Sequence, residues 1–198
     1  VALANNFLAV PSPYDNDEGT EAGALYLFYT NDDGESFTQT SKLYASIPNA
    51  DDRFSWQVAF SEIGILYVGG RGSGDSAVDV FILDDEQQYT HSTRLQPDDF
   101  QDGDVFGENI RAYDNLLIAR SSHRDNERGV VYIFLTEDSG NSFEQVASLQ
   151  PSDLEDGDEF GETTITKKYA VVCVASHNEG KGACYAYQTL DSGYSWFQ

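Results

Sequence analysis

Two pairs of aspartates have the spacing of cation ligands. The pairs are Asp102 with Asp104 and Asp156 with Asp158, and Asp99 and Asp153 precede them at equal distances. Residues 15–19, Asp-Asn-Asp-Glu-Gly, form another oxygen-rich cluster. Calcium takes about six to eight oxygen ligands, so each site would also need backbone carbonyls, water or a second loop. Calcium is therefore a candidate cofactor, although an Asp-Gly turn is the simpler interpretation of both pairs.

Histidine, serine and arginine do not form a recognisable catalytic set. Ser122 adjoins His123, and Ser176 adjoins His177, but neither pair shows the orienting acid and sharp turn that activate a nucleophile. The arginines have no spacing that directs several of them at one pocket; they are Arg53, Arg71, Arg94, Arg111, Arg120, Arg124 and Arg128. The sequence therefore predicts a protein that is not an enzyme.

A second motif, Ser/Thr-x-Asp-x-Gly-x-Ser/Thr-aromatic, occurs three times, at residues 30–37, 136–143 and 189–196. An Asp carboxylate can accept backbone N–H bonds inside such a turn, and the Gly supplies a positive φ. The structural residues that this assigns are Asp32 and Gly34, Asp138 and Gly140, and Asp191 and Gly193. The motif resembles the Asp box of sialidase-type propellers, which implies a role in folding and none in catalysis.

These motifs recur because the chain is a repeat. Residues 95–108 and 149–162 are identical at ten of fourteen positions with an offset of 54. The similarity continues as Leu116–Ala119 against Ala170–Cys173 and as 122–123 against 176–177. Aromatic residues also recur at intervals of 53, at Phe28, Phe81, Phe134 and Tyr187. Such a period is typical of propellers and solenoids.

Each copy is expected to form four short antiparallel strands. In the third copy they are residues 105–110, 116–120, 130–135 and 142–149, with Gly, Asp and Asn between them. Four strands in about 50 residues predict a propeller blade. We therefore expect one all-β propeller domain over residues 1–198, with blades at about 1–42, 43–94, 95–148 and 149–198. A β-solenoid is the main alternative, although its repeats are usually shorter.

Asp-Gly-Asp-Val-Phe-Gly at 102–107 and Asp-Gly-Asp-Glu-Phe-Gly at 156–161, with Gly-Val-Val-Tyr-Ile-Phe at 129–134, resemble the FG-GAP repeat of integrin-α-like propellers. The resemblance implies a propeller in an extracellular or cell-surface setting and names no activity. Phe106 and Phe160 would then wedge between blades. Gly107 and Gly161 would allow backbones to approach closely.

Composition limits the partners. The net charge is −23, from 34 acidic and 11 basic residues, and such a field repels nucleic acid and anionic membranes. The apolar runs are too short to cross a bilayer. The two cysteines, Cys173 and Cys184, form either one bridge or two free thiols. We predict a cross-strand disulfide, because a tight loop between 176 and 181 would place them opposite each other.

The sequence is 14 residues short of four copies of 53. We therefore expect the first blade to lack its innermost strand, with Phe7–Val10 left for a partner strand. Two classes of function follow. One is a non-catalytic module that binds a protein or glycan ligand through its loops, as in adhesion. The other is a structural subunit, a homo-oligomer joined head-to-tail in a filament. A sialidase-like glycosidase is a third alternative, although it would need clustered arginines and a Tyr–Glu pair.

Overall fold

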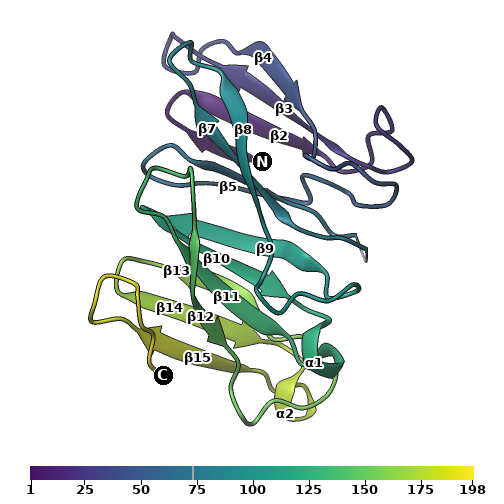
Figure 1. Ribbon diagram of the computed structural model, residues 1–198, viewed down its shortest axis with the longest axis vertical. Coiled ribbons are helices and arrows are strands. Elements are labelled where there is room, and N and C mark those ends of the chain that lie inside the picture. Colours follow the sequence, from purple (N-terminus) through teal and green to yellow (C-terminus); the bar gives the residue numbers. More distant parts are fainter. Residues whose placement is uncertain (73) are drawn as a thin grey trace.

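The computed structural model describes residues 1–72 and 74–198 as an all-β chain of four antiparallel sheets (Figure 1). The strands are β1 Ala2–Ala4, β2 Phe7–Ser12, β3 Ala24–Tyr29, β4 Thr38–Leu43, β5 Gln57–Phe60, β6 Leu66–Gly69, β7 Val78–Leu83, β8 Tyr89–Leu95, β9 Phe106–Tyr113, β10 Leu116–Ser121, β11 Val130–Leu135, β12 Glu144–Leu149, β13 Glu162–Ile165, β14 Tyr169–Val174 and β15 Ala183–Gln188. Two short turns are helical by hydrogen bonding, α1 Arg124–Glu127 and α2 His177–Gly180.

The sheets follow one another in chain order from the top to the bottom of Figure 1. Their strand orders are β1-β2-β3-β4, β5-β6-β7-β8, β9-β10-β11-β12 and β13-β14-β15, so neighbouring strands are also consecutive in sequence. The first strands lie side by side, because β5 contacts both β1 and β9, and β9 contacts β13. Among the described residues, no helix is long and apolar enough to span a membrane.

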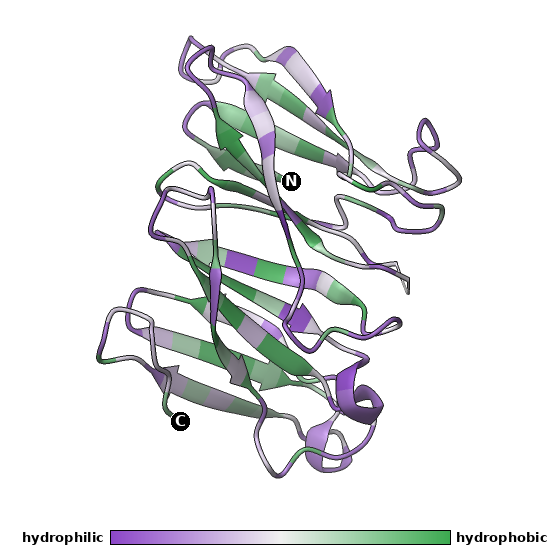
Figure 2. Cartoon of the chain, in the orientation of Figure 1, coloured by the Kyte–Doolittle hydropathy of each residue, from purple (hydrophilic) through white to green (hydrophobic). Residues whose placement is uncertain are grey.

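Apolar side chains fill the spaces between successive sheets. One cluster joins the first and second sheets, another the second and third, and another the third and fourth. The strand β11 shows why: all six of its residues are buried, since Val131 and Ile133 face the fourth sheet while Tyr132 and Phe134 face the second. Hydrophobic colour is concentrated on inner strands such as β11, whereas the connections and the outer strands β4 and β8 are largely polar (Figure 2).

The expectation of an incomplete first blade is wrong. Asn5 and Asn6, both with positive φ, make a tight turn that brings β1 back against β2. Phe7 and Ala9 therefore have partners in both β1 and β3. The sheet with fewer strands is the fourth, where Phe197 forms only an isolated bridge with Gln188.

Strand pairing also moves the alignment of the repeats by one residue. Leu117 pairs with Phe134, and Ala170 pairs with Tyr187, so Ala170 corresponds to Leu117 and not to Leu116. The same shift applies to the helical turns, in which His177 corresponds to Arg124 and not to His123. Side chains on a strand alternate between faces, so this shift decides which residues face a neighbouring sheet.

Candidate functional site

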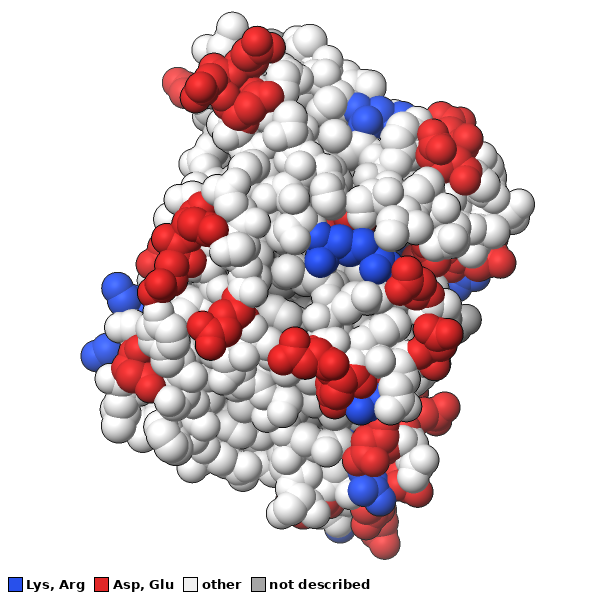
Figure 3. Space-filling model, in the orientation of Figure 1, with Lys and Arg blue, Asp and Glu red and all other residues white. Residues whose placement is uncertain are grey.

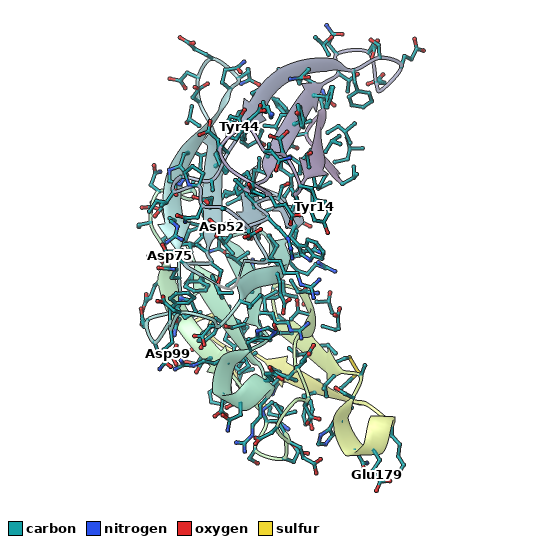
Figure 4. The ribbon with its side chains drawn as sticks, turned by 90° about the vertical axis from the view of Figure 1, so that its right-hand side faces the viewer. Tyr14, Tyr44, Asp52, Asp75, Asp99 and Glu179 are labelled. Carbon is teal, nitrogen blue, oxygen red and sulfur yellow. A yellow bond between two sulfur atoms is a disulfide. The ribbon has the colours of Figure 1, made fainter. Side chains whose placement is uncertain are left out.

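The longer connections lie at one edge of the stack, at the right in Figure 1, and we call it the loop edge. Figure 4 looks onto this edge, where Asp52, Asp75 and Asp99 lie one below another. A row of acidic side chains with interspersed basic ones follows the right-hand side of the surface in Figure 3. We call the opposite edge, which carries the Asp-box-like turns, the turn edge.

On the loop edge the third sheet has an open hollow of about 610 Å³. It is lined almost entirely by hydrogen-bonding side chains, from the loop before β9, the α1 turn, and the end of β12. They are Asp99, Gln101, Asp104, His123, Arg124, Asp125, Asn126, Ser148 and Gln150, with Val130 as the apolar member.

Arg124 organises the wall of this hollow. Its Nη2 lies 2.9 Å from Oδ2 of Asp99, and its Nη1 lies 3.3 Å from Oδ2 of Asp104. The Tyr132 hydroxyl donates to the other oxygen of Asp99 at 2.9 Å. Asp104 also accepts the backbone N–H of Gln101 at 2.8 Å, which closes the loop before β9. The guanidinium of Arg124 therefore links the α1 turn to the loop before β9.

Burial differs sharply along this network. Tyr132 and Asp104 are buried, whereas the side chain of Asp99 is 55 % exposed and that of Arg124 is 17 % exposed. Burial, with a smaller contribution from the hydrogen bond to Asp99, raises the pKa of Tyr132. The phenol of Tyr132 therefore stays protonated at neutral pH, and its O–H donates a hydrogen bond to Asp99. The hollow presents fixed donors and acceptors over a rigid base.

The fourth sheet repeats part of this arrangement. His177 Nδ1 lies 2.7 Å from Oδ2 of Asp158, and Asp158 accepts the backbone N–H of Glu155 at 2.7 Å. Tyr185 occupies the place of Tyr132, and burial, followed by Asp153, raises its pKa to about 12. Beyond β15, the fourth sheet has an isolated bridge between Gln188 and Phe197.

The four aspartates proposed as calcium ligands do not converge. Asp104 and Asp158 are buried in the loop-closing roles just described, whereas Asp102 and Asp156 are exposed, and Asp156 pairs with Arg128 at 2.8 Å. Within residues 1–72 and 74–198, no three or more His, Cys, Asp and Glu side chains are grouped to hold a metal ion.

In the cluster at residues 15–19, a lysine stands where a cation would bind. The Nζ of Lys42 lies 2.9 Å from Asp15 and 2.5 Å from Asp17. The hydrogen bond from Lys42 is the main reason that the pKa of Asp15 falls below its usual value. The Tyr26 hydroxyl also donates to Asp15, at 3.1 Å. These carboxylates are satisfied within the chain.

The three Asp-box-like turns share one hydrogen-bond pattern. In the second, Asp138 accepts the Ser142 hydroxyl at 2.6 Å and its backbone N–H at 2.8 Å, and Thr136 accepts the N–H of Gly140 at 3.0 Å. The same bonds form around Asp32 and Asp191. Bonds from the serine hydroxyl lead the causes that lower the pKa of all three aspartates to about 2. Asp138 and Asp191 are exposed and Asp32 is partly exposed, and each holds its turn together at the turn edge.

The Phe-Gly positions lie between sheets. Phe106 and Phe160 are fully buried, Phe106 between the second and third sheets and Phe160 between the third and fourth. A Cβ on Gly107 would lie 3.0 Å from the carbonyl oxygen of Ala77, and one on Gly161 would lie 2.4 Å from Arg120. A side chain at Gly161 would therefore displace Arg120, and one at Gly107 would be in tight contact with the backbone of Ala77.

Cys173 and Cys184 are directly opposed in β14 and β15 and form a disulfide. In the third sheet the corresponding cross-strand pair is Arg120 and Val131. The bridge therefore lies on the side of the fourth sheet that faces away from the third.

Sequence reasoning missed one buried charge network near the first strands. Arg120 is 8 % exposed, and its Nε lies 3.3 Å from Glu108. Its Nη2 donates to the Glu159 carbonyl at 2.8 Å, and Glu108 also meets Arg71 at 3.5 Å. The missed signal was an arginine inside an otherwise apolar strand, Leu-Leu-Ile-Ala-Arg, where burial requires a partner.

Fold and site together define an all-β protein of stacked antiparallel sheets with a polar loop-edge hollow. No family model and no curated protein matches the sequence. Among solved structures, a protein of unknown function from Dyadobacter fermentans DSM 18053 is similar, with a TM-score of 0.59 and 11% identity over 96% of this chain. The chain spans 64% of that protein's length. An α-L-arabinanase of Penicillium chrysogenum, complexed with arabinobiose, matches 98% of this chain and 66% of its own, with a TM-score of 0.48 and 11% identity.

Proposed function

We propose that the four sheets are consecutive blades of a β-propeller, and that the chain is a non-catalytic extracellular module that binds a glycan in the third-sheet hollow. The blade assignment is supported by sheets that follow chain order, by first strands that lie side by side, and by the 53-residue spacing of the third-strand aromatics. The disulfide suits an oxidising compartment.

The network around Arg124 carries the assignment of a glycan. Sugar hydroxyls both donate and accept, and this hollow offers guanidinium, carboxylate, amide and hydroxyl groups within one open surface. A single apolar member, Val130, gives little reason for an apolar ligand to bind. The hydrogen bonds and ion pairs around Arg124 already hold these side chains in place, so less conformational entropy is lost when a ligand binds.

The same contacts argue against hydrolysis. A glycosidase needs one carboxyl group that delivers a proton and a second that acts as base or nucleophile. Here Asp99 and Asp104 share one guanidinium, and Asp125 accepts from Gln150 at 3.1 Å and lies 3.5 Å from Arg128. Each carboxylate in the hollow is thus committed to a structural partner.

A glycan array of neutral and acidic oligosaccharides, followed by calorimetric titration of the best ligand, tests this proposal. Arg124→Gln should weaken binding by about tenfold or more, because both aspartates lose their shared cation. Arg111→Gln is the control, since Arg111 is an exposed arginine of β9 in the same sheet and does not line the hollow. An absence of glycan binding, or release of sugar products on incubation, would overturn it.

A further inference from the structure

The first sheet has an apolar face that is not covered by any other sheet of residues 1–72 and 74–198. Its residues alternate, and one set packs against the second sheet. The residues that point away are Leu3, Leu8, Val10, Tyr26 and Phe28, and with Phe37 at the turn edge we call them the head face. Leu3 is 65% exposed and Phe37 is 38% exposed.

Equivalent residues elsewhere in the stack lie in the core. Leu8 corresponds to Leu117 and Phe28 to Phe134, since each pair holds the same cross-strand position, and both counterparts are buried against the second sheet. Phe37 corresponds to Phe143, whose ring centroid lies 6.0 Å from that of Tyr67 in the second sheet. The head face therefore has the composition of a sheet-to-sheet interface.

Among the described sheets, only the third packs against the fourth, so the other face of the fourth sheet is uncovered there. Ala170, Val172 and Tyr187 pack against the third sheet, so the alternate residues point outward. We call these the tail face, and they are Thr164, Tyr169, Val171, Cys173, Cys184 and Ala186. Tyr169 is 55% exposed. Apart from Tyr169, the side chains are small, and they oppose large aromatic groups on the head face.

The internal joints show how these two faces would meet. Gly140 lies against Ile65 of the preceding sheet, where a Cβ would be 3.1 Å from Ile65 Cδ1. Gly193 lies against Leu116 in the same way, at 2.9 Å. The glycine in the first sheet, Gly34, has no atom within 4 Å of its Cβ position.

Tyr169 is the residue that corresponds to Ile65 and Leu116. Each of the three lies one residue before the one that pairs with the third-strand aromatic. Gly140 and Gly193 are thus covered by Ile65 and Leu116, whereas no described residue covers Gly34. Tyr169, which corresponds to Ile65 and Leu116, covers no described glycine. Gly34 is in the first sheet and Tyr169 is in the fourth, so they lie at opposite ends of the stack.

Charge at the turn edge agrees with this pairing. Lys167 and Lys168 are exposed beside Tyr169, in the turn before β14. The turn that holds Gly34 carries Asp33 and Glu35, which are also exposed. In a joint built like the internal ones, these lysines would face these carboxylates, and their opposite charges would favour the contact.

We propose that two copies of this chain join head-to-tail, with the tail face of one packed on the head face of the next as a further sheet-to-sheet interface. Tyr169 of one copy covers Gly34 of the other, and Phe37 packs on Val171. The joint is face-to-face, and it leaves the edge pairing of Phe7–Ala9 intact. It does not depend on a ligand in the hollow.

Sedimentation velocity of the 198-residue chain, from low to high micromolar concentration, tests the joint. Wild type should self-associate, whereas Phe37→Lys and Tyr169→Asp should each raise the dissociation constant by about tenfold or more. Both positions are exposed, so circular dichroism should show both variants folded. Ile47→Lys, at a residue 51% exposed on the loop edge, is the control and should associate like wild type.

Mixing the two variants gives the sharper result. Phe37→Lys keeps an intact tail and Tyr169→Asp an intact head, so an equimolar mixture should form a heterodimer with one wild-type joint although neither variant associates alone. This follows from a heterologous interface and not from an isologous one. A wild type that stays monomeric at high micromolar concentration would overturn the proposal. So would a mixture that stays monomeric, or association that survives both substitutions.

Discussion

Gly129 lies so close to Phe160 that a Cβ on Gly129 would stand 2.4 Å from the Phe160 carbonyl oxygen. The N–H of Phe160 donates to the carbonyl oxygen of Arg128 at 2.8 Å, which ties the loop before β11 to the segment just before β13 of the fourth sheet. Gly23 and Phe54 repeat this contact at 2.3 Å between the first two sheets. A recurring backbone contact therefore joins the first sheet to the second and the third sheet to the fourth.

Gly129→Ala should destabilise the fold well beyond the cost of its backbone conformation. Gly157 is the matched control, because it has the same φ of +83 with nothing within 4 Å of its Cβ position. Gly157→Ala should cost about 1–2 kcal/mol for its left-handed backbone. Gly129→Ala should cost about 1–3 kcal/mol more, for the overpacking. Equal urea midpoints for the two variants would contradict the contact.

Arg120→Ala should destabilise the protein by about 3–5 kcal/mol, because it leaves the buried carboxylate of Glu108 without its nearer cation. Arg120→Met with Glu108→Leu should recover most of the loss, because the carboxylate that Arg120 neutralised is gone and the remaining cation, Arg71, has a side chain that is 48% exposed. Chemical denaturation of the single and double variants measures this. A double variant less stable than Arg120→Ala would show that the network has another role.

The Asp-box-like turns should make the free energy of unfolding depend on pH. The pKa of Asp138 is about 2 in the fold and 3.8 ordinarily, so the folded state favours the ionised form. Its contribution is complete above about pH 4 and disappears as the pH falls towards 2. Asp138→Asn should therefore lower the Tm at pH 7, and the difference from wild type should shrink on acidification. Melting curves at several pH values test this, and a gap that is constant down to pH 2 would contradict it.

Replacing both cysteines, as Cys173→Ala with Cys184→Ala, should cost about 2–3 kcal/mol, the chain-entropy value for a loop of this size. Denaturation of the double variant, compared with wild type under oxidising and reducing conditions, gives the difference. Reduced wild type should approach the variant. Equal stability in all three would show that the bridge adds nothing to the fold.

The repeat and most strands could be predicted from the sequence because their signals are local. The aromatic spacing of 53 located the third strands, and Thr-x-Asp-x-Gly located the turns. The strand β1 was missed because Ala2–Ala4 is short and weakly β-forming, although Asn5-Asn6 is a hairpin signal. The one-residue shift arose because Ala and Val runs align equally well in two registers.

The hollow could not be predicted, because its walls come from separate strands and loops. Asp99, Arg124 and Tyr132 meet only once strand pairing is fixed. Spacing alone pointed to Asp102 and Asp104, of which Asp102 is exposed and Asp104 is buried. Burial, which the sequence does not display, separates the exposed aspartate from the one that closes the loop.

Paired calorimetric titrations of Asp99→Asn and Asp153→Asn with the best array ligand test the central claim most directly. These aspartates hold the same place in consecutive repeats, but of the two only Asp99 lines the third-sheet hollow and contacts both Arg124 and Tyr132. Asp99→Asn should weaken glycan binding by about tenfold or more, while Asp153→Asn should bind like wild type. Equal affinities for the two variants would contradict a binding site in the third-sheet hollow.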